Sequence, residues 1–402
     1  MIGAGYTGLS AAIAAHDAGA KVAVIDSGLP GEGASTRNGG MLGAHPRLSW
    51  DVLAKRYGDA AADGLYREAA EGLDWVKTFI ADEGIDCDFA ETGRIQLAYT
   101  AKHFEAQQAM ADRVSDKGGV PCKIISRQEL AGEIATPLYK GGLVFPNHGA
   151  VHPGKYLMGF LAAALRREIP VVPGCPALKV VRLKEGMQAT TPLGAVCARK
   201  LVLATNGYTG VQFPWHSRRV FPVPSYLIAT EPLPVDLIDR LAPGRRMMVE
   251  TRAKHSYFRV SPDGTRIIFG GRAALVDIGL KKAALRLRET MVGIWPELQH
   301  VKLSHVWTGN TGYTFGHMPH VGERDGFYYA MGYSGGGTVL APWLGRKAAL
   351  QALELPEGDT AYSASRLTGR WFFKGGRPRF MTAANLWYRH VVDPREKRES
   401  ER

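Results

Sequence analysis

The pattern of apolar and polar residues predicts βα units near both ends of the chain. Residues 7–18 form an alanine-rich helical pattern that stops at Gly19, a residue type suited to the position after a helix. Residues 21–26 (KVAVID) are nearly continuous in β-branched residues, as in a buried parallel strand. Near the other end, FYYAM, GYSGGG and TVLAPWLGRKAALQAL predict a strand, a glycine loop and a helix.

Between these units the chain mixes helices and strands. Helices are predicted over residues 50–82, 101–118, 154–167 and 280–293. Two strand segments, 256–260 and 266–271, flank a Pro-Asp-Gly turn that suits a hairpin. Because similar units lie at both ends, we predict an α/β fold in which one dinucleotide-binding domain is built from discontinuous segments and a second domain is inserted.

The first glycine turn, GAGYTG, has the spacing of a dinucleotide-binding fingerprint. Gly3, Gly5 and Gly8 would make the tight turn, admit a pyrophosphate and let helix and strand pack closely. Asp26 ends the next strand, where a carboxylate binds ribose hydroxyls and repels a 2′-phosphate, so NADP is disfavoured. A purely structural glycine turn is the alternative.

The loop after Asp26, GLPGEGASTRNGGML, favours FAD over NAD. Arg37 would supply positive charge for a pyrophosphate, and Ser35 and Thr36 would supply hydrogen-bond donors. Gly39 and Gly40 would allow the backbone to pass close to a flavin ring. An ordinary flexible loop is the alternative.

Only Met1 and Ile2 precede the glycine turn, where a central buried strand is expected. Loss of such a strand would expose apolar neighbours and leave the turn without an anchor. We therefore expect an incomplete beginning, and a cofactor-deficient homologue without activity remains an alternative.

The amino-acid composition argues against a disulfide-rich, zinc-binding or membrane-spanning protein. The 402 residues are 45% hydrophobic and 22% charged, as in ordinary globular proteins. The four cysteines, at 87, 122, 175 and 197, lack zinc or disulfide spacing, so we expect no metal and a reducing, cytoplasmic compartment. No apolar run reaches the ~18 residues of a spanning helix.

The net charge of +12 leaves several interpretations open. Twelve Lys/Arg face five Asp/Glu between Asp239 and Glu289. A solvated basic surface, an anionic substrate, nucleic acid and an acidic membrane surface all fit. Nucleic acid is disfavoured, because the chain has no separate RNA-binding module and no lysine-rich aromatic face.

Several motifs together carry a family resemblance. GAGYTGLSAA, Asp26 and GASTRNGGM resemble the FAD-dependent amine and amino-acid oxidases typified by D-amino-acid oxidase, glycine oxidase and sarcosine oxidase. Within that family, the chain most resembles the γ-glutamylputrescine oxidoreductase-like branch. The likeness continues in order through GAVHPGKYLMGFLAAAL, KLVLATNGYTG and WTGNTGYTFGHMPHVGERDGFYYAMGYSGGGTVLAPWLG, to about residue 355.

The resemblance implies cofactor roles at matching positions. The ADP half of FAD would be held by Gly3, Gly5, Gly8 and Asp26. The residues that run past the pyrophosphate and flavin would be Ser35, Thr36, Arg37, Asn38, Gly39, Gly40 and Met41. The adenine end would be met by the backbone of Val180 and closed by Thr205, Asn206 and Gly207. The flavin pyrimidine edge would face Gly335, Gly336, Gly337 and Thr338 at a helix N-terminus, a fixed positive partner for reduced flavin.

The resemblance also implies a Rossmann-like FAD-binding domain and a mixed β-sheet substrate domain. The expected ranges are 1–84, 144–214 and 308–360 for the first, 85–143 and 215–307 for the second, and 361–402 for a C-terminal extension. Two positions depart from the family pattern: many relatives carry an acidic residue where this chain has Gly316, and histidine where it has Gly336. Residues 307–312 contain no cysteine, so we expect non-covalent FAD.

The implied reaction removes hydride from a carbon bearing an amine, giving an imine that hydrolyses. The substrate would be a small amine or amino acid, and the electron acceptor and any catalytic residue stay open. Arg259 is the first candidate for a substrate carboxylate, with Tyr257 on the same strand face. His317 is a further pocket candidate, and Arg272 and His45 are weaker ones.

The alternative for Arg259 is that it is an arginine on the surface of a strand with no role in substrate binding. For the whole chain, a flavoprotein acting on modified tRNA is a second enzyme class, and the net charge favours it mildly.

Overall fold

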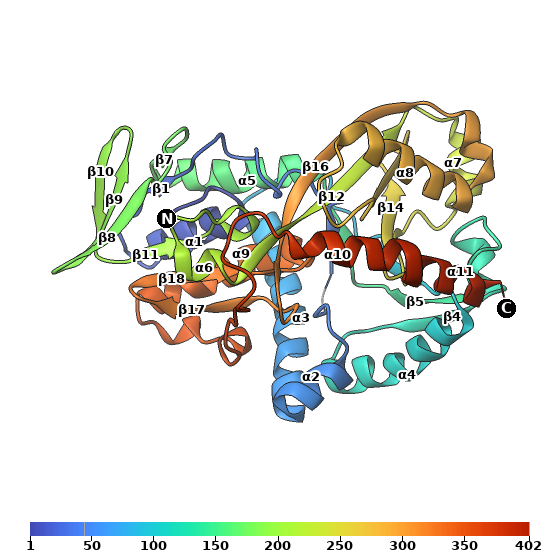
Figure 1. The fold of residues 1–402 in the computed structure, drawn as a ribbon, viewed down its shortest axis with the longest axis horizontal. Coiled ribbons are helices and arrows are strands. Elements are labelled where there is room, and N and C mark those ends of the chain that lie inside the picture. The colour runs from blue at the N-terminus through green and yellow to red at the C-terminus, as the bar shows by residue number, and fades with distance from the viewer. Residues whose placement is uncertain (44, 402) are drawn as a thin grey trace.

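A computed structural model describes residues 1–43 and 45–401. The sheet of the predicted FAD-binding domain and the mixed sheet of the predicted substrate domain lie side by side (Figure 1). The helices are α1 Tyr6–Asp17, α2 Trp50–Tyr57, α3 Asp59–Asp82, α4 Ala101–Gly118, α5 Pro153–Arg166, α6 Pro214–Ser217, α7 Val235–Leu241, α8 Leu280–Ile294, α9 Gly337–Ala352, α10 Phe380–Trp387 and α11 Asp393–Ser400. Within the described residues, no helix is long and apolar enough to cross a membrane.

The strands form one sheet that is parallel except for its last edge strand, a large mixed sheet and smaller pieces. They are β1 Val24–Ile25, β2 Met41–Leu42, β3 Arg94–Leu97, β4 Lys123–Ser126, β5 Gly141–Phe145, β6 Gly149–Ala150, β7 Val171–Val172, β8 Lys179–Leu183, β9 Gly186–Thr191, β10 Gly194–Ala198, β11 Leu201–Leu203, β12 Val220–Thr230, β13 Met247–Glu250, β14 Ser256–Val260, β15 Ile267–Gly271, β16 Leu303–Thr314, β17 His320–Arg324 and β18 Phe327–Met331. The α/β class and the mixed second sheet confirm the predicted fold class.

Ile2 stands at the centre of the cofactor-side sheet. It bridges Ile25 of β1 and Leu203 of β11, both in parallel, so β7, β1, Ile2, β11, β18 and β17 follow one another. The Gly3 N–H donates to the Ile25 carbonyl at 2.8 Å, and Ile2 is only 7% exposed. The expectation that the glycine turn lacks an anchor is therefore wrong, because these few backbone bonds hold it between two strands.

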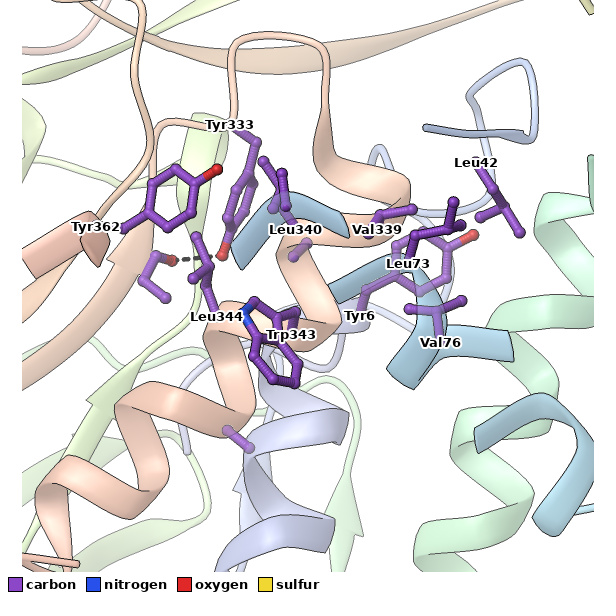
Figure 2. Packing of buried hydrophobic residues seen from close by; sticks show 14 of the residues in the cluster. Tyr6, Leu42, Leu73, Val76, Tyr333, Val339, Leu340, Trp343, Leu344 and Tyr362 are labelled. Carbon is purple, nitrogen blue, oxygen red and sulfur yellow. Dashed lines mark hydrogen bonds between the residues drawn. The ribbon is translucent and has the colours of Figure 1, made fainter. Parts of the chain in front are cut away.

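Helices α1 and α9 pack together over this sheet and form its core with α3 (Figure 2). The Thr7 and Tyr333 hydroxyls lie 2.7 Å apart, and the Ser10 hydroxyl donates to the Pro342 carbonyl at 2.7 Å. Side chains of Tyr6, Trp343 and their neighbours fill the space between the helices. The two βα units from opposite ends of the sequence are thus joined into one core.

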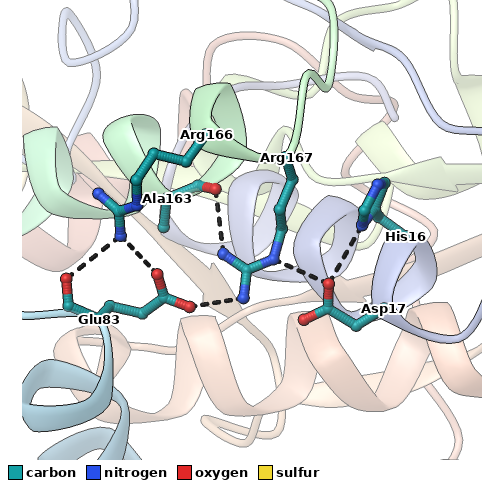
Figure 3. Close-up of polar contacts among 6 residues, drawn as sticks. All are labelled: His16, Asp17, Glu83, Ala163, Arg166 and Arg167. Atoms are coloured by element: carbon teal, nitrogen blue, oxygen red, sulfur yellow. Dashed lines mark hydrogen bonds and ion pairs between the residues drawn. The ribbon is translucent and has the colours of Figure 1, made fainter.

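An ion-pair network ties the C-terminal ends of three helices on the same side of the protein (Figure 3). The Glu83 carboxylate accepts from Arg166 at 2.5 Å and Arg167 at 2.6 Å, and Arg167 also donates to Asp17 at 2.8 Å. These hydrogen bonds, the one from Arg167 above all, lower the pKa of Glu83. The network links the ends of α1, α3 and α5.

The second sheet, most of which belongs to the predicted substrate domain and which is called the substrate-side sheet below, has eight strands in the order β16-β12-β15-β14-β13-β3-β5-β4. Only the β13–β3 pair is parallel among its described pairings. The predicted hairpin is confirmed as β14 and β15, and α8 covers one face of the sheet. The predicted helix 50–82 breaks in two, because Gly58 adopts a φ of +89° between α2 and α3.

A three-stranded arm and two C-terminal helices lie outside these two sheets in Figure 1. Strands β8, β9 and β10 form an antiparallel arm beyond the cofactor-side sheet. Helices α10 and α11 lie across the front of the substrate-side sheet, in a segment whose sequence shows no clear period.

Candidate active site

The glycine turn borders a cavity that extends to the start of α9. Gly3 has a φ of +108°, and a Cβ on Gly8 would lie 1.8 Å from the Gly3 carbonyl oxygen, so both positions require glycine. Gly5 is the N-cap residue of α1 and has no side chain to cap the helix, so the Ser35 hydroxyl accepts from the first helical N–H instead. Gly3 and Gly5 line the cavity, whereas Gly8 lies behind them and sets the approach of helix to turn.

Asp26 closes the turn from the end of β1. Its carboxylate accepts from the Ala4 N–H at 2.6 Å and from the Gly28 N–H at 2.9 Å. It also lines the cavity, with acceptor capacity left for a hydroxyl group. Asp26 therefore shapes the turn as well as presenting a carboxylate to the cavity.

The loop after Asp26 contributes fewer lining residues than the sequence predicts. Ser35 and Asn38 line the cavity, and the Ser35 hydroxyl accepts from the Tyr6 N–H at 3.2 Å. Thr36 instead donates to the Gly31 carbonyl, and Arg37 reaches out to the Thr308 carbonyl at 3.3 Å. Gly39, Gly40 and Met41 lie beyond the cavity lining, towards the substrate-side sheet.

At the predicted adenine end of the cavity, some of the lining residues differ from those that the sequence predicts. Thr205 and Asn206 line the cavity, and the Asn206 side chain accepts from the Gly332 N–H at 2.9 Å. Gly207 packs on β16 and Val180 lies on β8, so neither lines it. Lining residues that the sequence reasoning missed include Cys175, Pro176, Ala177, Tyr208, Gln212 and Phe213. Cys175, Pro176 and Ala177 immediately precede the predicted strand, which was the available signal.

The far end of the cavity meets the start of α9. Gly335, with a φ of +106°, lines it together with Gly337 and Thr338, while Gly336 occupies the uncapped N-cap position. The N-termini of α1 and α9, each with glycine at the N-cap position, and a carboxylate at the end of β1 are the donor and acceptor set that a dinucleotide requires. The residues present fit FAD.

The family described as "FAD dependent oxidoreductase" (DAO) matches residues 1–351. The chain belongs to this family. It is 30% identical over 355 residues to the probable oxidoreductase OrdL of Rhizobium meliloti, covering 88% of this chain and 82% of that protein. It is 29% identical over 380 residues to γ-glutamylputrescine oxidoreductase of Escherichia coli, covering 94% and 88%.

Solved structures of the family share the fold. Glycine oxidase from Geobacillus kaustophilus superposes with a TM-score of 0.74 at 18% identity, covering 92% of this chain and 98% of that one. The predicted resemblance, the FAD-dependent oxidoreductase activity and the cofactor are thereby confirmed.

The predicted substrate residues of this FAD-dependent oxidoreductase lie beyond Gly39. The Tyr257 hydroxyl lies 2.9 Å from that of Ser225, and burial raises the pKa of Tyr257 to about 12. Its ring packs so close to Gly39 that a Cβ there would lie 2.9 Å away. Tyr257 thus joins the FAD-side loop to the substrate-side sheet.

Arg259 is buried, with 6% of its surface exposed. Its guanidinium donates to the Val151 carbonyl at 3.0 Å, to the Gly39 carbonyl at 3.4 Å and to the Val260 carbonyl at 3.0 Å. Burial lowers its pKa to about 10. These contacts make Arg259 a support of the backbone at Gly39 and Val151.

A second pair of arginines has a different environment. Arg272 donates to the Tyr313 hydroxyl at 2.7 Å, and the guanidinium carbon of Arg47 lies 5.5 Å from the centre of the same ring. Desolvation, and then the charge of Arg272, lower the pKa of Arg47. A Cβ on Gly335 would lie 3.7 Å from both Arg47 Nη1 and Tyr313 Oη, so this arginine pair adjoins the α9 end of the cavity.

Two histidines, His317 and His255, lie near the arginine pair. The exposed His317 points its ring edge-on to Tyr313, with centroids 5.8 Å apart. Burial, and then the charges of Arg272 and Arg47, lower the pKa of His255 well below its usual value. Among the described residues, no ion pair joins Arg47 or Arg272 to a carboxylate. His45 lies apart from them against Arg94, and burial lowers its pKa to about 3.

Proposed function

We propose that this enzyme oxidises the carbon–nitrogen bond of a small amine or amino acid that carries a carboxylate. The observation that carries the proposal is the arginine pair, Arg47 and Arg272, which lacks a carboxylate partner and adjoins the α9 end of the FAD cavity. Two guanidinium groups beside one phenol suit a carboxylate, which accepts several charge-assisted hydrogen bonds. The bound FAD would accept hydride from the carbon that bears the amine.

The chain's own residues would bind and orient this substrate. Arg272 and Arg47 hold the carboxylate, and their positive charges disfavour the ammonium form of a nearby substrate amine, leaving the neutral amine that the reaction requires. His255, with its lowered pKa, stays neutral and adds no further charge. Arg259 acts as a positioning residue, because its donors hold the backbone at Val151 and Gly39.

We further propose that FAD is held without a covalent bond and that the enzyme works in the cytoplasm. Among the described residues, the cysteines at 87, 122, 175 and 197 form no disulfide bond, in keeping with a reducing compartment. Cys175 lines the adenine end of the cavity rather than the flavin end, and Trp307–Gly312 contains no cysteine.

An anaerobic titration tests the proposal. We expect the yellow holoenzyme to bleach with an N-substituted glycine and to stay yellow with the matched amine that lacks the carboxylate.

Arg272→Gln should raise the KM for the carboxylated amine about 10- to 100-fold, because it removes a charge-assisted hydrogen bond. Arg47→Gln should act in the same direction.

The control is Arg182→Gln, an exposed arginine on β8 of the arm, which should leave KM unchanged. Each variant must retain its flavin absorbance. Equal bleaching by both amines, or an unchanged KM in Arg272→Gln, would contradict the carboxylate site.

A further inference from the structure

The C-terminal part of the chain contains a long stretch without acidic residues. Residues 360–392 hold six basic residues and no Asp or Glu; the basic ones are Arg366, Arg370, Lys374, Arg377, Arg379 and Arg389. The same stretch holds seven aromatic residues, namely Tyr362, Trp371, Phe372, Phe373, Phe380, Trp387 and Tyr388. We call it the basic aromatic segment. Neither the FAD cavity nor the arginine pair uses its outer surface.

The inner face of the segment is fixed on the protein. Phe373 and Met381 are buried in one cluster with Phe221 and Tyr313. The Asn385 side chain of α10 accepts from the Leu275 N–H at 3.0 Å. Just beyond the segment, Asp393 pairs with Lys254 at 2.6 Å. The outer face therefore has a defined orientation, along the front of the substrate-side sheet in Figure 1.

The outer face exposes large apolar side chains. Trp371 is 84% exposed and Trp387 is 59% exposed, and the other exposed ones are Phe372, Leu386 and Val391. Phe372 lies 5.7 Å from Trp371 and 5.4 Å from Phe380, ring centre to ring centre, so the loop aromatics continue into α10. Trp387 and Val391 are four residues apart, on one side of the helical backbone. So much exposed aromatic surface points to an interaction site.

Exposed cations flank these side chains. Arg370 and Lys374 border Trp371 and Phe372, and Arg377 and Arg379 precede α10. In the described part of the chain, none of the six cations of the segment is in an ion pair. Tryptophan and phenylalanine beside unpaired arginine and lysine are the composition of surfaces that lie in a membrane interface.

We propose that the outer face of the basic aromatic segment docks on an anionic lipid bilayer. The apolar side chains enter the headgroup region, and the cations contact lipid phosphates. A second copy of the chain fits less well, because a symmetric contact would bring together two stretches that each hold six basic residues and no acidic one. Nucleic acid fits less well, because Leu386 and Val391 offer no ring for base stacking.

Docking has a consequence for the active site. Tyr313, which Arg272 contacts, belongs to the cluster that holds the inner face of the segment. The docked enzyme therefore holds its substrate side close to the lipid surface. The proposal does not depend on which amine the enzyme oxidises.

Vesicle sedimentation of the holoenzyme tests the proposal. We expect binding to vesicles that contain phosphatidylglycerol, little binding to phosphatidylcholine alone, and loss of binding as salt rises. The double variant Trp371→Ser/Trp387→Ser and the triple variant Arg370→Gln/Lys374→Gln/Arg377→Gln should each weaken binding by about tenfold or more. Flavin absorbance and melting temperature check that the variants fold.

Matched controls come from the β8–β10 arm, which also exposes apolar and basic side chains. Leu193→Ser and Arg182→Gln/Lys184→Gln should leave vesicle binding unchanged. The proposal would be overturned if the enzyme bound neutral vesicles equally well or bound no vesicles at all. It would also be overturned if the control variants weakened vesicle binding as much as the segment variants do. So would a dimer, seen by light scattering, that dissociates in Trp371→Ser/Trp387→Ser, or RNA binding lost in the same variant.

Discussion

At the scale of single residues, Gly8 determines how α1 meets the glycine turn. A Cβ there would overlap the Gly3 carbonyl at 1.8 Å, and the backbone on both sides is buried and hydrogen-bonded. Gly8→Ala should destabilise the fold by about 3 kcal/mol or more and release FAD. Flavin absorbance per chain and the melting temperature measure both effects. Gly132→Ala, where a Cβ meets nothing within 4 Å, is the control.

Also at the residue scale, His320 should make stability depend on pH. It is 3% exposed, and burial lowers its pKa to about 4. The unfolded chain, with the usual histidine pKa, therefore binds more protons, so stability is full above about pH 6.5 and is lost as pH falls towards 4. Between about pH 7.5 and pH 5, His320 alone should cost about 2 kcal/mol.

Urea unfolding of wild type and His320→Asn at the two pH values checks this. The variant should lose less stability on acidification, while the exposed His390→Asn should behave as wild type. An identical loss in wild type and His320→Asn would show that another group is responsible.

At the scale of elements, Gly345 decides how closely α1 and α9 pack. A Cβ at Gly345 would lie 2.3 Å from the Thr7 carbonyl oxygen, so alanine must push the helices apart. We expect Gly345→Ala to cost about 1–3 kcal/mol and to loosen FAD, since both helices begin at the cavity. Gly293→Ala in α8 meets nothing within 4 Å and should instead stabilise by about 0.5–1 kcal/mol. Equal effects on the melting temperature would contradict the close-packing explanation.

Elements with a strong local pattern were predictable. The helix at 101–118 and the hairpin of β14 and β15 follow from hydrophobic period and turn residues. Helix α10 was missed because both of its sides carry apolar residues, so Met381 faces the protein while Trp387 faces solvent. Only the packed partners tell the two sides apart.

At the scale of the whole molecule, the arginine pair comes from segments far apart in the sequence. Arg47 follows β2, whereas Arg272 follows β15, and Tyr313 at the end of β16 lies between them. Arg259 sits on β14, next to β15, yet its guanidinium is taken up by carbonyls. Sequence spacing gave no means to separate these arginines, because the difference lies in what each one faces. The assignment of residue ranges to two domains stays a prediction.

The FAD-binding class of this protein could be predicted from local sequence, because GAGYTG, Asp26 and the GYSGGG turn depend on glycine conformations and on a carboxylate at a strand end. Which residues line the cavity depends on the tertiary structure: residues 175–177 line it, whereas the predicted Val180 does not. The tertiary structure also decided which arginines lack a carboxylate partner and which face of the basic aromatic segment meets solvent. Those properties depend on distant neighbours, since burial and ion pairing are set by what the fold brings into contact.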